Sequence, residues 1–421
     1  MTPAELSVVF FLQLFVIIAA CRGVGWLARK FLGQPQVVGE MIAGVVLGPS
    51  LLGLFAPGAQ AMLFPPESKS VLFVGAQLGV GLYMFLVGLE FRRDHFRANA
   101  KSAAAVSIAG MAAPFAVAIA ITPWLLGIPG LFAPTVNQFE ASLFMGAAIA
   151  ITAFPMLARI IKERGLADTP LGTLSLSAGA IDDAAAWCVL AIVLASFGDG
   201  PMVAVQAIVG GLAFAAFMIL FGGRLLAPLG RMAEKADEVT TPLLAITLMA
   251  FMLSAFAMDA IGIHAVFGGF LLGTAMPRGL FADDLKRKLE PFTLIVLLPM
   301  FFTFSGLHTQ LSIVTDPQLL GVALAILAAS ILAKGGACWL VARLTGQDNA
   351  TAMGIGALMN ARGLMELIII NIGLQRGIIG PGLFSMLVLM AIITTMMASP
   401  LFEAVYGRKA RAEGRLAAKE G

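Results

Sequence analysis

Long apolar stretches separated by short polar connections follow one another along the whole chain. A hydrocarbon core of about 30 Å needs about 20 mostly apolar residues in each helix that spans it. Thirteen stretches approach or exceed this length, and the pattern therefore predicts an all-α, polytopic membrane protein with thirteen transmembrane helices. The predicted helices cover residues 5–27, 35–54, 70–89, 102–126, 138–161, 171–197, 201–226, 241–258, 261–276, 291–307, 318–342, 350–374 and 380–405.

Composition and charge agree with this pattern. Of the 421 residues, 59% are hydrophobic and only 12% are charged, and the mean hydropathy is +0.94, which excludes a soluble enzyme. Most of the 27 Lys and Arg residues fall in alternate connections and in the C-terminal tail. Because Lys and Arg favour cytoplasmic loops, we predict a multi-pass protein of the cell inner (plasma) membrane. Its N-terminus lies outside and its C-terminus in the cytoplasm.

Two predicted helices carry a helix breaker and polar groups at membrane depth. Pro155 interrupts the helix at 138–161, and the string NARG at 360–363 interrupts the helix at 350–374. Freed backbone groups survive in a bilayer only where they line a cavity or are buried in protein. The two helices are seven apart in chain order, an odd number, so they run in opposite directions.

Discontinuous helices at matching positions are typical of transporters built from inverted repeats. We therefore predict repeats at about 5–197 and 241–405, joined by a linker helix at about 201–226. Residues 1–421 would form a single membrane transport domain, and we expect no cytoplasmic nucleotide-binding domain.

Adjacent carboxylates, Asp182 and Asp183, lie in the middle of the apolar stretch 171–197. A charge at this depth costs roughly 2.5 to 3.5 kcal/mol or more. Successive helical side chains diverge by about 100°, so one carboxylate can be paired while the other stays open. Lys334, in the middle of another span, is the expected partner of Asp182. A buried carboxylate beside a second one can hold either a proton or a small cation.

Other polar groups in the spans allow a structural role as well as a functional one. Arg362 and Glu366 are four residues apart on a helix and can neutralise each other. Asn360 is either a hydrogen-bonding support of the helix break or a cation ligand. His264 is read as a hydrogen-bonded helix residue, with a pH sensor as the alternative. For Glu40 the sequence gives no preference between an aqueous funnel and the headgroup region.

With these positions established, the chain resembles the membrane domain of the monovalent cation:proton antiporter-2 family. This family includes bacterial glutathione-gated potassium efflux systems and plant cation/proton exchangers. The matching strings occur in family order along nearly the whole chain, at residues 34–50, 85–91, 152–159, 181–187, 262–270 and 360–367.

The resemblance implies a homodimer in which each protomer has a scaffold domain and a core domain that moves as an elevator. It also implies that Asp183 carries the cation and the proton, with Asp182 as its partner and Lys334 as the core lysine. Thr152 would lie near the ion at the first helix break. The potassium efflux systems have Gln-Asp where this chain has Asp-Asp, whereas two acids with a lysine resemble electrogenic sodium/proton exchangers. Na⁺ and K⁺ therefore both stay open.

From these features we expect a secondary antiporter that exchanges a monovalent cation for protons. The alternatives are a channel-like potassium pathway, although no carbonyl-lined filter sequence is present, and an organic-anion symporter on a similar scaffold. We expect no enzymatic activity and no cofactor. The three cysteines form no CxxC pair, and the only metal expected is the monovalent cation at Asp183. The basic residues are spread over many segments, so nucleic acid is not an expected partner.

Overall fold

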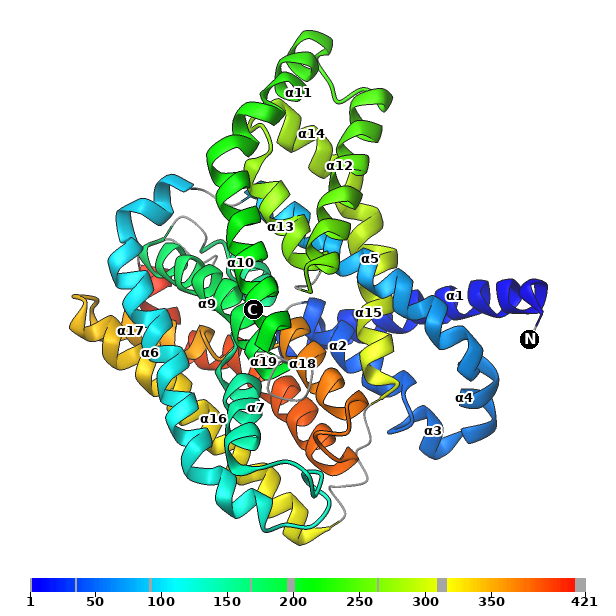
Figure 1. Cartoon of the computed structure of the whole chain (residues 1–421), viewed down its shortest axis with the longest axis vertical. Coiled ribbons are helices and arrows are strands. Elements are labelled where there is room, and N and C mark those ends of the chain that lie inside the picture. The colour runs from blue at the N-terminus through cyan, green and yellow to red at the C-terminus, as the bar shows by residue number, and fades with distance from the viewer. Residues whose placement is uncertain are drawn as a thin grey trace. The chain divides into compact units, whose positions relative to one another are not determined.

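The computed structural model describes residues 2–34, 36–90, 93–166, 169–194, 201–262, 265–308 and 316–412. Throughout these ranges the chain forms helices joined by short turns, with one isolated β-bridge between Phe132 and Ile379. The all-helical class expected from the sequence is therefore confirmed (Figure 1).

Nine helical stretches within the described residues are long and apolar enough to cross a membrane. Helices also lie at each of the other four predicted spans. These are α7 (Gln138–Ala150) with α8 (Phe154–Glu163), α9 (Pro170–Leu194), α13 (Ala265–Ala275), and α17 (Asn349–Leu358) with α18 (Leu364–Gln375). The count of thirteen membrane crossings remains a prediction.

Two predicted boundaries were wrong by ten residues or more, and both helices are longer than expected. The predicted linker helix continues past residue 226 to Ala236, as α10 (Pro201–Phe217), the π-helical turn η2 (Met218–Gly222) and α11 (Gly223–Ala236). The helix predicted from residue 291 begins at Leu280, as α14 (Leu280–Phe292), η3 (Thr293–Leu297) and α15 (Leu298–Gly306). Charged residues in α11 and α14 end the apolar pattern while the helix continues, because an amphipathic helix needs only one apolar face.

The chain divides into two compact units, and each is assembled from three separate chain segments. Unit 1 comprises Met1–Arg22, Ala43–Arg92 and Leu194–His308. Its first two segments contain the first part of α1 (Pro3–Leu32), the end of α2 (Gln36–Leu47), α3 (Leu52–Phe55), α4 (Pro57–Leu63) and α5 (Pro66–Glu90). Its third segment contains all the helices from α10 to α15, which include α12 (Thr241–Ala260).

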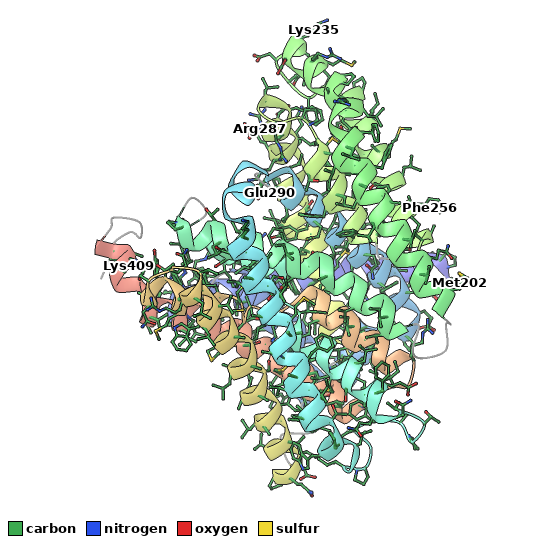
Figure 2. All side chains as sticks on the ribbon, turned by 60° about the vertical axis from the view of Figure 1, so that its left-hand side comes forward. Met202, Lys235, Phe256, Arg287, Glu290 and Lys409 are labelled. Carbon is green, nitrogen blue, oxygen red and sulfur yellow. The ribbon has the colours of Figure 1, made fainter. Side chains whose placement is uncertain are left out.

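Close backbone contacts and buried polar contacts hold unit 1 together. A Cβ on Gly88 of α5 would lie 2.3 Å from the carbonyl oxygen of Phe270 on α13, so only glycine allows this approach. The Arg278 guanidinium donates to carbonyl oxygens at the ends of α5 and α13. Helices α11 and α14 of this unit contact each other, and Figure 2 labels Lys235 on α11 and Arg287 on α14.

Unit 2 comprises Gly23–Ile42, Arg93–Val193 and Thr309–Gly421. It contains α6 (Arg93–Leu126), α7, α8, α9, α16 (Pro317–Leu344), α17, α18 and α19 (Pro381–Ala412). Helices α6 and α16 pack side by side (Figure 1). Buried apolar side chains from α6, α8, α9, α16, α17 and α19 form one continuous cluster. Both units draw on both predicted repeats, and the inverted repeats themselves stay a prediction.

Candidate functional site

The predicted helix breaks are present, and they meet inside unit 2. The first leaves residues 151–153 outside any helix between α7 and α8, and the second leaves residues 359–363 outside any helix between α17 and α18. At the crossing, the Ala153 N–H donates to the Ala361 carbonyl oxygen at 3.1 Å. Each break therefore satisfies part of the other's backbone, as burial in an apolar medium requires.

Two buried cations lie at the C-terminal end of α7. Lys334 Nζ donates to the Ala150 carbonyl oxygen, and to Gly110 of α6 at 3.2 Å. Arg362 donates to the carbonyl oxygens of Ala148 at 3.1 Å and Ile149 at 2.7 Å. The last carbonyl groups of a helix lack partners within the helix and carry partial negative charge. Lys334 and Arg362 supply both the missing hydrogen-bond donors and a compensating positive charge.

Asp182 of α9 is hydrogen-bonded through both carboxylate oxygens. Its Oδ1 accepts from the Ser107 hydroxyl of α6 at 2.5 Å. Its Oδ2 accepts from the Thr152 hydroxyl at 2.8 Å and from Lys334 Nζ at 2.9 Å. The side chains of Asp182 and Lys334 are both 0% exposed. The contact between Lys334 and Asp182 that the sequence predicts is therefore present.

Asp183, the next residue, is in a different environment. It is also buried, at 2% exposure, yet its Oδ1 accepts no hydrogen bond from the residues that the structure describes. A buried carboxylate oxygen without a donor is costly, and a proton or a metal cation removes that cost. The 100° divergence of successive helical side chains thus yields one saturated carboxylate and one that can still take a ligand.

The Thr152 hydroxyl shares its single hydrogen between Asp182 and the Met359 carbonyl oxygen, which lies 3.0 Å away. Thr152 therefore lies at the first break, where it was expected, and links that break to the second one. Within the described part of the chain, its hydrogen bonds go to Asp182 and Met359 and not to Asp183. A direct contact between Thr152 and a bound ion stays a prediction.

Arg362 and Glu366 lie 3.6 Å apart between Nη1 and Oε1, and both side chains are buried. Arg362 Nη2 also donates to Ser330 of α16. Asn360 Nδ2 donates to the Gly356 carbonyl oxygen at 3.0 Å, so it supports the end of α17. Its Oδ1 has no hydrogen-bond partner among the described residues, so a role as cation ligand stays a prediction.

Sequence reasoning did not find three hydroxyl residues that hold these charges. Ser107 contacts Asp182, and Ser330 contacts Arg362. Thr395 of α19 accepts from the Arg362 N–H at 3.0 Å and donates to the Arg362 carbonyl oxygen at 2.8 Å. Each is a single small polar residue in an apolar stretch, a weak signal because such residues also bond to their own helix backbone.

Two residues that the sequence left undecided have different outcomes. His264 lies outside the described residues. Glu40 of α2 is fully buried, at 0% exposure.

Discontinuous helices that cross around buried charges at membrane depth are the arrangement found in secondary transporters, and comparison with known proteins identifies the family. The model for the transmembrane part of sodium/hydrogen exchangers matches residues 6–405. The chain is 39% identical over 397 residues to Na(+)/H(+) antiporter NhaS4 of Synechocystis sp., covering 94% of this chain and 96% of that one. It therefore belongs to the sodium/hydrogen exchanger family, which confirms the resemblance seen in the sequence.

Three further comparisons define the extent of the similarity. The chain is 32% identical over 413 residues to K(+)/H(+) antiporter 1 of Saccharomyces cerevisiae, covering 94% of this chain but 46% of that one. Plant relatives named cation/H(+) antiporters are likewise covered over about half their length. For Cation/H(+) antiporter 17 of Arabidopsis thaliana, the alignment covers 48% of that protein. The sodium proton antiporter MjNhaP1 of Methanocaldococcus jannaschii has the same fold, with a TM-score of 0.64, 17% identity, and coverage of 97% of this chain and 99% of that one.

Proposed function

We propose that the protein exchanges a monovalent cation, Na⁺ or K⁺, for protons across the cell membrane, and that Asp183 binds the two in turn. The observation that carries this proposal is the contrast between the two adjacent carboxylates. Asp182 has donors on both oxygens, whereas Asp183 Oδ1 has none among the described residues. The relatives named as Na(+)/H(+), K(+)/H(+) and cation/H(+) antiporters support the same activity.

Charge balance gives a reason for the exchange. Lys334 compensates Asp182, and Arg362 compensates Glu366, so the negative charge of Asp183 remains. A net charge is costly to move through a medium of low dielectric constant. One proton or one monovalent cation at Asp183 neutralises these five side chains, and the unit can then move with either ion.

We further propose that unit 2 is the moving body of an elevator and that unit 1 is the scaffold of a homodimer. All the side chains of the candidate site described above belong to unit 2, and the buried apolar cluster connects six of its helices. A unit held together in this way can carry an ion without losing its geometry. The topology proposed with it places the N-terminus outside and the C-terminus in the cytoplasm of a plasma membrane.

The direct test is proton flux in proteoliposomes when Na⁺, K⁺, Li⁺ or Rb⁺ is added separately. We expect at least one of these ions to drive protons in the opposite direction, and Asp183→Asn to abolish the flux while the protein still inserts. Asp316→Asn is a matched control, because Asp316 is an exposed cap of α16 and asparagine caps as well. If Asp183→Asn exchanges ions at more than about a tenth of the parent rate, the assignment is contradicted. Such a rate would mean that the substitution raises the activation free energy by less than about 1.4 kcal/mol.

Competition between the two ions separates this mechanism from the alternatives. If one carboxylate binds both ions, the apparent cation affinity should fall as the pH is lowered. The fall should be up to about tenfold for each pH unit when one proton is displaced per cation. Raising the cation concentration should then move the acidic limb of the activity profile to lower pH. A potassium channel would conduct without this competition, and an organic-anion symporter would show no dependence of proton flux on the inorganic cation.

A further inference from the structure

A second buried carboxylate in unit 2, that of Glu366, lacks hydrogen-bond donors. Glu366 is 0% exposed, and neither Oε1 nor Oε2 accepts a hydrogen bond from the described residues. Its partner of opposite charge is Arg362, with 3.6 Å between Nη1 and Oε1, which is beyond hydrogen-bond distance. The carboxylate of Asp182, by contrast, is bonded through both oxygens.

The hydrogen bonds of Arg362 go elsewhere. Nη1 and Nη2 donate to the carbonyl oxygens of Ala148 and Ile149 at the end of α7, and Nη2 also donates to Ser330. Nε has no hydrogen-bond partner among the described residues. Three neutral acceptors and the negative end of α7 therefore keep the guanidinium stable whether or not Glu366 is charged. The pair is loose enough for Glu366 to lose its charge without leaving Arg362 isolated.

The charged groups around Glu366 come from few elements. Arg362 lies beside it, and Lys334 of α16 acts on it electrostatically. Helices α7 and α19, which pack against α18, carry their charged residues near their outer ends. These are Glu140 in the first turn of α7, and Glu403, Arg408, Lys409 and Arg411 in the last part of α19.

From this geometry we infer that Glu366 is a second proton-binding site, which holds a proton when Asp183 is empty and releases it when a cation binds at Asp183. The inference rests on the exchange proposed above. The ligand is a proton and not a second metal cation, because Arg362 repels a cation at this position. An alkali cation also needs several oxygen ligands, whereas a proton needs one.

The step itself is a simple protonation, in which one O–H bond forms on a Glu366 oxygen. The proton comes from the aqueous phase that supplies the exchange, and it returns there. With Asp183 ionised, protonated Glu366 leaves Lys334 and Arg362 balanced by Asp182 and Asp183. With a cation at Asp183, ionised Glu366 restores the balance. Cation binding at Asp183 and proton binding at Glu366 are therefore opposed, in addition to the direct competition of the two ions for Asp183.

The test is proton release when the cation that drives transport is added to purified protein in weakly buffered detergent, measured across a range of pH. In the parent protein, two carboxylates should supply protons, Asp183 by direct displacement and Glu366 through charge balance. In Glu366→Gln, the number of protons released per cation bound should fall, while release from Asp183 continues. Glu366→Asp keeps a titratable acid and should retain part of the additional release.

Controls separate this proposal from the proposed function and from a folding defect. Glu140→Gln removes a carboxylate from the same unit, keeps the capping box of α7, and should release protons like the parent. Asp183→Asn should bind no cation and release no proton, which tests the exchange itself. If Glu366→Gln binds the cation and releases protons at every pH as the parent does, Glu366 is a structural partner of Arg362 and the inference is wrong. If Glu366→Gln does not fold, Glu366→Asp decides, since an unshifted release profile there would equally overturn the inference.

Discussion

The two half-helices that lead into the crossing, α7 and α17, are held by different groups at both ends. At its C-terminal end α7 meets two buried cations, Lys334 and Arg362. The corresponding end of α17 meets neutral donors, the Asn360 amide and the Thr152 hydroxyl. At their N-terminal ends, α7 begins with a capping box of Asn137 and Glu140. Helix α17 begins with Asp348, which pairs with Lys409 of α19.

The difference shows where negative potential remains in unit 2. The partial negative charge at the end of α7 is already neutralised by fixed side-chain cations, so it offers little to a mobile cation. The end of α17 has only neutral donors and keeps its partial charge. For the cation that we propose to bind in this unit, the end of α17 is therefore the more favourable of the two helix ends. Lys334 and Arg362 act as permanent substitutes for an ion at one break only.

The largest effect should come from removing a cation at the end of α7. Arg362→Ala leaves the carbonyl groups of Ala148 and Ile149, and the buried Glu366, without their counter-charge. We expect a loss of about 3 to 5 kcal/mol of stability, seen as a large fall in the melting temperature in detergent. Asn360→Ala removes only a neutral donor and should cost about 1 kcal/mol. Equal losses for the two variants would show that the two ends do not differ in the way described.

A smaller effect is expected for the partner pair. Lys334→Ala removes the contact to Asp182 and one donor to α7, and it leaves a buried carboxylate unpaired. In an Asp182→Asn background the carboxylate is already gone, so the same change should cost less, with an interaction of about 0.5 to 3 kcal/mol. Thermal unfolding of the two single variants and the double variant measures this difference. Fully additive losses would mean that the 2.9 Å contact contributes nothing to stability.

Ser107 should have a measurable but smaller role as a positioning residue. Ser107→Ala removes the donor to Asp182 Oδ1, and a hydrogen bond to a charged group contributes about 1.5 to 3 kcal/mol. We therefore expect Ser107→Ala to lower the melting temperature in detergent, while cation-driven proton flux stays detectable. Ser107→Thr keeps the hydroxyl and should melt near the parent temperature, whereas an unchanged melting temperature in Ser107→Ala would rule out this role.

The sequence predicted the features that depend on a local pattern of residues or on the free energy of burying a charge. A continuous apolar stretch is sufficient to predict a span, and a breaker with polar neighbours is sufficient to predict the breaks at residues 151–153 and 359–363. Burying Lys334 without a partner is unfavourable, so Asp182 was predicted to pair with it, and this contact is present. These predictions succeeded because each follows from a free energy that one or two residues determine.

Features that depend on packing between distant segments were not predictable in this way. No sequence spacing relates Ser107 to Asp182, or Arg362 to the end of α7. Arg362 and Glu366 follow helical spacing and suggest a simple ion pair. The structure instead places residue 362 before α18 begins, so Arg362 is free to turn towards α7. The charged start of α14 was missed for a related reason, because unit 1 buries only one of its faces.

The smallest effect concerns the charged N-terminal end of α17. Partial burial raises the pKa of the Asp348 carboxyl, but hydrogen bonds from Lys409 and Thr351 outweigh this effect and hold the pKa well below its ordinary value. Lys409 is on α19, near the end of the described chain (Figure 2). A lowered folded-state pKa stabilises the protein above the unfolded value of about 4, and the gain is lost as pH falls through the folded value. The Asp348 side chain is 50% exposed, so solvent screening limits the effect to about 1 kcal/mol or less.

Asp348→Asn, which keeps a capping side chain, should therefore lower the melting temperature in detergent slightly at neutral pH. The difference from the parent should shrink below about pH 4, where the Asp348 carboxyl of the unfolded parent begins to gain a proton while that of the folded parent stays ionised. Asn137→Asp on α7 is the reciprocal change, and it adds a charge where Glu140 already supplies one. It should give no stabilisation of the same kind, because among the described residues no cation pairs with that end of α7. If the Asp348→Asn difference is the same at every pH, the contribution comes from cap geometry and not from the pair with Lys409, and the contrast between the two N-terminal ends is one of shape alone.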